Sequence, residues 1–145
     1  MKKVFFGFAV LVAAAVSVLG ATMATAGNTG GAPTVTHIAW DPANKPACGA
    51  GTAWSYKVDP VTSGVYGPIS ITVNGSSFSW SILPEYLHTY DMGSILVKGG
   101  PSSVKVYDFT DPSNDSWDGL TAAENPNNGK PYGLSHILIC LDPKA

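Results

Sequence analysis

One stretch of the chain gathers side-chain oxygens that could bind a metal ion. These residues are Asp108, Asp111, Asn114, Asp115 and Asp118. Calcium takes roughly six to eight oxygen ligands, and backbone carbonyls and water can complete the shell. The spacing differs from that of an EF-hand loop, and Asp or Asn followed by Pro, Ser or Gly is also typical of ordinary turns. We therefore keep two interpretations, a calcium site and a solvated turn.

A second group with possible chemistry is the adjacent pair Ser135 and His136, with Asp108 or Asp118 available to orient the imidazole. A catalytic triad requires the fold to hold the serine against the base, whereas neighbouring residues of a strand point to opposite faces. The alternation instead places His136 on the face of Leu134, Leu138 and Cys140. We expect a structural histidine whose ring bonds backbone groups of a long loop, residues 125–129. A ligand or metal contact remains the alternative.

Aromatic residues form the third group: Trp40, Trp54, Trp80, Trp117, Tyr86, Tyr90, Tyr107 and Tyr132. Most fall in predicted strands, where large rings pack in a core. Trp117 differs, because it lies between polar residues in a predicted loop. It is expected to contact a ligand, to contact a partner subunit, or to pack the loop onto the domain. With Tyr132, Asn125 and Asn127 it would form a sugar-binding site.

The beginning of the chain predicts export. Lys2 and Lys3 precede an uncharged apolar run over residues 4–19, and Ala24-Thr25-Ala26 is typical of a cleavage site. These features indicate a signal peptide over residues 1–26. The competing interpretation is a membrane anchor, but the run is shorter than the ~20 residues that a span needs. Localisation is therefore expected to be secreted, extracellular or at the cell surface.

After cleavage, residues 27–33 are expected to form a flexible Gly-rich leader and residues 34–145 a single domain. Cys48 and Cys140 are the only cysteines. In an exported protein they most simply form one disulfide. A pair of metal thiolates or a nucleophile would require spacing or neighbours that the sequence lacks.

Charge narrows the classes of partner. The chain has no arginine, six lysines after residue 26 and ten acidic residues. Nucleic-acid binding requires a basic surface, so the composition argues against that class. After signal cleavage, nothing in the chain suggests membrane association.

The clearest local structure is a hairpin around Asn74-Gly75, between alternating runs at residues 69–73 and 76–82. Asn-Gly suits a type I′ turn because both central residues take positive φ. A loop of these two residues sets the register and gathers the apolar side chains on one face. The expected cross-strand pairs are Ile71 with Phe78 and Ile69 with Trp80.

Further strands are expected at residues 35–40, 54–58, 94–98, 104–109 and 134–141, separated by Gly, Pro, Asn and Asp. Short alternating runs with such turns are typical of all-β domains. The sequence therefore predicts an antiparallel β-sandwich of about seven strands, with one disulfide and long surface loops at 41–52 and 110–133.

The last third of the chain resembles an uncharacterised family of secreted and surface-attached bacterial domains. The resemblance rests on Lys98-Gly99-Gly100, Tyr107-Asp108-Phe109, Leu120-Thr121-Ala122, residues 125–130, Leu134-Ser135-His136-Ile137 and Cys140. Ala123 departs from it, because proline is usual there. The chain also stops soon after Cys140 without a sorting signal. The resemblance implies location and disulfide, and these departures favour a freely secreted subunit.

Three functions follow as hypotheses. The first is a non-enzymatic structural or adhesive subunit of the extracellular matrix or cell surface, which contacts itself or other surface proteins through strand edges. The second is a carbohydrate-binding module that uses the loop aromatics and binds polysaccharide. The third is a small secreted hydrolase, for which no paired carboxylates or activated nucleophile can be identified. No cofactor is expected beyond a possible calcium ion.

Overall fold

The computed structural model describes residues 27–145. The predicted signal peptide lies outside these residues. Within the described part, no helix is long and apolar enough to cross a membrane.

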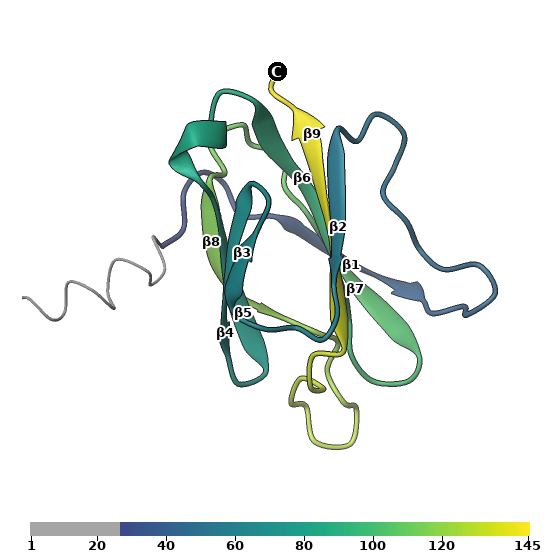
Figure 1. The fold of residues 1–145 in the computed structure, drawn as a ribbon. Helices are drawn as coiled ribbons and strands as arrows, with labels where there is room; N and C mark the ends of the chain where they lie inside the picture. Colours follow the sequence, from purple (N-terminus) through teal and green to yellow (C-terminus); the bar gives the residue numbers. More distant parts are fainter. Residues whose placement is uncertain (1–26) are drawn as a thin grey trace, which may run out of the picture.

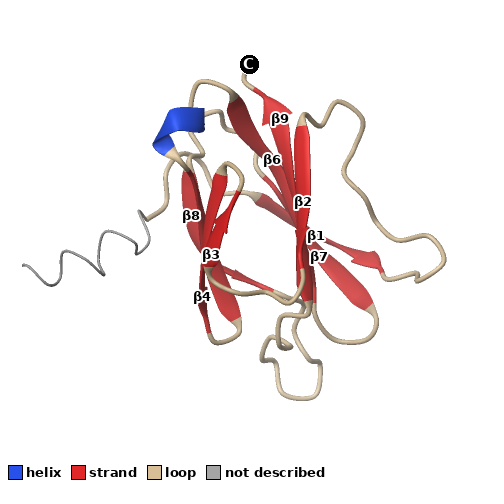
Figure 2. Cartoon of the chain, viewed as in Figure 1, coloured by secondary structure: helices blue, strands red, loops and turns tan. Residues whose placement is uncertain are grey.

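Within residues 27–145, nine antiparallel strands form two sheets that face each other (Figures 1 and 2). One sheet has the order β1-β7-β6-β9-β2 and the other the order β3-β4-β5-β8. The strands are β1 (Thr34–Ala39), β2 (Trp54–Val58), β3 (Gly64–Tyr66), β4 (Ile69–Asn74), β5 (Ser77–Ile82), β6 (Tyr90–Lys98), β7 (Ser103–Asp108), β8 (Ser116–Thr121) and β9 (His136–Pro143). A single 3-10 turn spans Pro84–Tyr86. The predicted all-β antiparallel fold is confirmed.

Two strands were not predicted. β3 is only three residues long, and β8 reads Ser-Trp-Asp-Gly-Leu-Thr. Asp and Gly are depleted in strands, so the local sequence of β8 predicts a loop. β8 forms because β5 offers it a pairing edge, with Leu120 opposite Phe78 and Trp117 opposite Trp80. The interval 110–133 is therefore interrupted by a strand and is not one surface loop.

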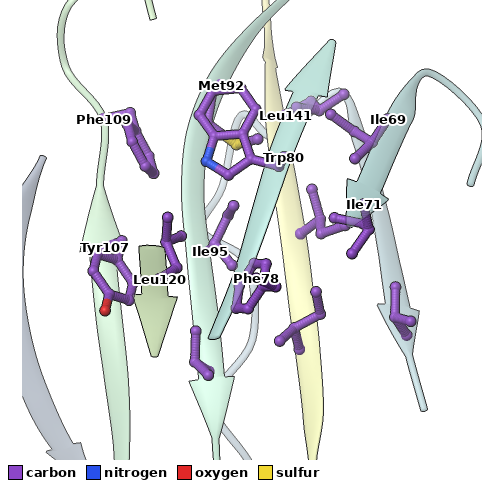
Figure 3. Close-up of a cluster of buried hydrophobic side chains, with 14 of the residues drawn as sticks. Ile69, Ile71, Phe78, Trp80, Met92, Ile95, Tyr107, Phe109, Leu120 and Leu141 are labelled. Atoms are coloured by element: carbon purple, nitrogen blue, oxygen red, sulfur yellow. The ribbon is translucent and has the colours of Figure 1, made fainter. Parts of the chain in front are cut away.

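The main core lies between the sheets. Figure 3 shows Phe78 and Trp80 of β5 projecting toward Ile95 and Leu141 of the opposite sheet. The Trp80 ring meets Phe109 edge to face, with ring centroids 5.0 Å apart. Burying such large rings removes much apolar surface from water, which is the main force holding the sheets together.

The predicted hairpin exists, but its register is shifted. Asn74 pairs with Ser77, so the two-residue turn is Gly75-Ser76 and not Asn74-Gly75. Only Gly75 has positive φ there, +66°, which fits a turn with glycine at the first central position. The observed pairs are Val73 with Phe78, Ile71 with Trp80 and Ile69 with Ile82. A shift by an even number of residues preserves the faces, so the predicted apolar face is nevertheless buried.

The predicted disulfide joins Cys48 to Cys140, with the two Cα atoms 5.6 Å apart. Cys48 lies in the segment between β1 and β2, which passes along the outer side of the five-stranded sheet (Figure 1). Cys140 lies in β9 and points to that outer side, away from the main core. The disulfide therefore ties this connecting segment to the outer face of the sheet.

The residues expected to form a free leader are bound to the domain. The Thr29 N–H donates to the Ser116 carbonyl, and the Ser116 hydroxyl donates to the Gly27 carbonyl. The Thr29 hydroxyl oxygen accepts the N–H groups of Asp115 and Ser116. Residues 27–31 thus cover the outer edge of β8, and the prediction of a flexible leader does not describe them.

Candidate functional site

The outer face of the five-stranded sheet carries a small second apolar cluster. Leu96, Val104 and Cys140 are buried there, with Trp40, Cys48, Val106 and Leu138 packed around them. Pairing aligns these side chains in two rows across the sheet. Lys98 lies opposite both Val104 and His136 in one row, and Leu138 lies opposite both Leu96 and Lys57 in the other.

A pocket of about 190 Å³ opens over these rows, and we call it the outer pocket. Its lining residues are Trp40, Lys45, Pro46, Lys57, Leu96, Lys98, Val104, His136 and Leu138. The sheet supplies the floor, and residues 40–46 supply one wall. Three lysines and a histidine line this single pocket without any carboxylate, although the whole chain has a net charge of −2.

Lys98 is the most buried of these cations, with 8% of its surface exposed. Its Nζ donates to the Gly100 carbonyl and lies 4.9 Å from the centroid of the Trp40 ring. None of the ion pairs within residues 27–145 involves Lys98. Burial of a cation without a carboxylate is costly, and the ring and the carbonyl offset only part of that cost.

The other cations of the outer pocket are more exposed. Lys45 and Lys57 lie at its rim, and Lys57 forms an ion pair with Asp59, with Nζ and Oδ2 3.6 Å apart. Both partners of this pair are about half exposed, so the ion pair is weak and screened by solvent.

The His136 ring meets Trp40 edge to face, with ring centroids 5.7 Å apart. The pKa of His136 lies below its ordinary value because burial and the nearby positive charges of Lys57, Lys98 and Lys45 disfavour the imidazolium, while Asp59 opposes them. The predicted face, shared with Leu138 and Cys140, is correct.

The predicted surroundings of His136 are otherwise wrong. The segment that covers the ring comes from residues 40–46 and not from residues 125–129. Leu134 precedes the strand and packs against the main core, so it does not share the face of His136. The strand begins two residues later than predicted, and strict alternation therefore does not extend back to Leu134.

Two of the residues considered as calcium ligands, Asn114 and Asp111, are engaged in other contacts. The Asn114 side chain is buried; its Nδ2 donates to the carbonyls of Thr29 and Gly31, and its Oδ1 accepts the Asp111 N–H. Asp111 accepts hydrogen bonds from the backbone of Ser113 and of Gly31 and from the Ser113 hydroxyl, which lower its pKa. These bonds are those of an Asx turn that holds residues 29–31.

The remaining acidic residues bond other neighbours through their backbone. The N–H groups of Asp115 and Asp118 donate to Thr29 and Asn28, the Asp118 Oδ1 is buried with no hydrogen-bond partner among residues 27–145, and Asp108 lies in β7 beside a shallow groove. Within residues 27–145, no group of three or more His, Cys, Asp or Glu side chains is placed to hold a metal ion. The contacts of Asp111 and Asn114 are those of a turn, and calcium binding by this segment stays a prediction.

The residues considered for sugar binding each make contacts of their own. Trp117 lies in β8, packs against the main core and meets Phe109 edge to face at 6.3 Å between centroids, so it packs the chain onto the sandwich. The Tyr132 ring packs on Gly100, where any side chain would collide with it. Asn125 accepts the N–H of Asn127 within a turn of its own loop. These contacts do not bring the residues together as one platform.

A different feature stands out at the end of the five-stranded sheet. All six residues of β1 are exposed, including Val35 at 43% and Ile38 at 40%. One side of β1 pairs with β7. Among residues 27–145, no other segment forms backbone hydrogen bonds with its outer side.

Sequence reasoning missed both the outer pocket and the free edge of β1. Lys57, Lys98 and His136 all fall in predicted strands, but the pairing of those strands brings them together. The available signal was the absence of any charged or proline residue in Thr34–Ala39, because exposed edge strands usually carry such residues.

The chain was compared with protein-family models, with curated proteins and with solved structures, and no match was found in any of the three.

Proposed function

We propose that the protein is a secreted, non-enzymatic structural subunit that associates with copies of itself through the outer edge of β1. The observation that carries this proposal is an edge strand, Thr34–Ala39, whose outer side is unpaired, whose six residues are all exposed, and which is free of lysine, acidic residues and proline. Such an edge is a ready template for another strand.

The ladder with β7 determines which backbone groups face outward. The Trp40 N–H donates to the Ser102 carbonyl, and the same register continues through Ile38 and Val104. In an antiparallel ladder, hydrogen-bonded and non-hydrogen-bonded pairs alternate. The N–H and C=O groups of Val35, His37 and Ala39 therefore point away from β7 and are available to a partner.

A second copy of the same strand fits this pattern. Antiparallel pairing about a two-fold axis at His37 places Val35 opposite Ala39 of the other copy and satisfies all three outward residues. Such an interface is self-complementary and joins the two five-stranded sheets into one. Thr34–Ala39 contains no lysine, aspartate or glutamate, so no such charges would face each other across this interface.

The other sheet edges are less available. Residues 27–31 cover β8, β3 has only three residues, and β2 carries Lys57. Charged residues and short length are the usual means of blocking edge pairing. β1 therefore differs from the other three edges in lacking any such protection.

The disulfide and the predicted export agree with the same role. The Cys48–Cys140 disulfide is of a kind that persists in oxidising compartments outside the cytosol. A disulfide-bonded sandwich with an unpaired β1 edge fits a matrix or cell-surface subunit that functions by associating with other copies.

The test compares the same substitution on two edge strands. Val35→Lys puts a charge on β1, whereas Val65→Lys puts it on β3 of the other sheet, where Val65 is 55% exposed. Sedimentation equilibrium of residues 27–145 should show dimers for the wild type and Val65→Lys, and monomers for Val35→Lys. Thermal unfolding checks that both variants fold. A monomeric wild type at millimolar concentration, or equal association of the two variants, would overturn the proposal.

A further inference from the structure

We infer that the outer pocket binds a small organic carboxylate, that is, a single anionic group on a compact apolar body. This inference is independent of the self-association through β1. It rests on the lining of the pocket, which combines apolar side chains with lysines and contains no carboxylate.

The apolar part of the lining selects the body of the ligand. Leu96, Val104 and Leu138 form the floor, and Trp40 and Pro46 form the wall beside it. Small-molecule sites are mostly apolar with a few placed polar groups. The volume of the pocket, about 190 Å³, is several times the ~30 Å³ that one water molecule occupies in the liquid. It is enough for one ring and one substituent, so a compact ligand fits within it.

The lysines select the charge. Lys45, Lys57 and Lys98 line the pocket together with His136, and no lining residue is acidic. An anion bound here would give the buried Lys98 ammonium the counter-charge that residues 27–145 do not provide. A cationic ligand would be repelled by the same groups. Because a desolvated charge pair is stronger than one in water, the contact with Lys98 should dominate the affinity.

The pocket is also held open by covalent structure. Cys48 is bonded to Cys140, so the segment that carries Trp40 and Pro46 remains positioned over the sheet. Lys98 Nζ is held in place by the Gly100 carbonyl and the Trp40 ring. A preformed site binds with little ordering cost.

The experiment is a calorimetric titration of residues 27–145 in the Val35→Lys background, which separates binding from self-association. The ligands are cyclohexanecarboxylate, cyclohexylmethanol as the uncharged analogue, acetate as the charge without the ring, and glucuronate as the same charge on a polar ring. Cyclohexanecarboxylate should bind at least tenfold more tightly than each of the other three.

Variants identify the site. Lys98→Met keeps the apolar stem and should weaken cyclohexanecarboxylate binding at least tenfold, and Lys57→Met at the rim should weaken it less. Lys130→Met, on an exposed loop outside the pocket, is the matched control and should bind as the wild type does. Equal binding of the uncharged analogue, of acetate or of glucuronate would overturn the inference, as would no binding at millimolar concentration or equal affinities of the Lys57 and Lys130 variants.

Discussion

At the scale of single residues, protonation of His136 should change the free energy of unfolding. Its pKa is lowered from an ordinary value of 6.5 by burial and by neighbouring lysines, so the folded protein binds a proton there less readily than the unfolded chain. The contribution of His136 to the free energy of unfolding is therefore fully present when the pH is above its pKa in the unfolded chain. This contribution is lost as the pH falls through its pKa in the folded protein. Asp111 and Glu124 have lowered pKa values too, but starting from 3.8 and 4.5, and so act at lower pH.

We therefore predict that His136→Gln flattens the pH dependence of stability between about pH 7.5 and 5.5, the range around the usual histidine pKa. The free energy of unfolding in urea should fall toward pH 5.5 in the wild type and fall less in the variant. Lys57→Met, which removes one of the nearby positive charges, should flatten it partly. An unchanged pH slope in His136→Gln would contradict this account of the outer pocket.

At the scale of elements, the polar loop with Asp111 and Asn114 holds residues 27–31 against β8, and we call this set of hydrogen bonds the clamp. Asn114 is 2% exposed and bonds two carbonyls of the segment at 2.6 and 2.8 Å. In the oxygen-rich pattern that suggested calcium, the side chains of Asp111 and Asn114 bond backbone groups. Both roles use side-chain oxygens of Asp and Asn placed close together in the chain, so the sequence pattern alone cannot separate them.

Asn114→Ala should lower the free energy of unfolding by about 2 kcal/mol, because buried backbone groups lose their partners. Hydrogen exchange at the amides of Thr29, Asp115 and Ser116 should also speed up, since residues 27–31 lose their anchor. Asn127→Ala, in an exposed turn, is the control and should stay within about 0.5 kcal/mol of the wild type. Equal effects of the two substitutions would show that the clamp does not stabilise the fold.

At the scale of the whole molecule, the disulfide connects the fold to the candidate site. It closes a loop of 92 residues and fixes the outer segment on β9. The double variant Cys48→Ala/Cys140→Ala should lose about 4.6 kcal/mol of stability by the chain-entropy estimate. It should also lose affinity for cyclohexanecarboxylate at temperatures where it is still folded. Urea unfolding and calorimetry measure the two effects, and unchanged stability together with unchanged affinity would contradict both.

Local chemistry in the sequence was enough to predict much of this fold. Alternating apolar residues, turn residues and two cysteines predicted an all-β sandwich with one disulfide, and the apolar face of the hairpin at 69–82 was predicted correctly. These features depend on neighbours along the chain or on the only possible cysteine pair. The hairpin register was missed by two residues because the glycine turn began one residue later than predicted.

Only the tertiary structure decided where the candidate site lies. Alternation tells which face a side chain takes but not which strand lies beside it, so the pairing of Lys98 with His136 could not be foreseen. The same holds for β8, which needs the edge of β5, and for β1, whose exposed edge follows from its place at the end of the sheet order. The sequence by itself therefore determined the type of strands and the covalent link, while strand order and register, which depend on contacts distant in the chain, determined the outer pocket and the free edge.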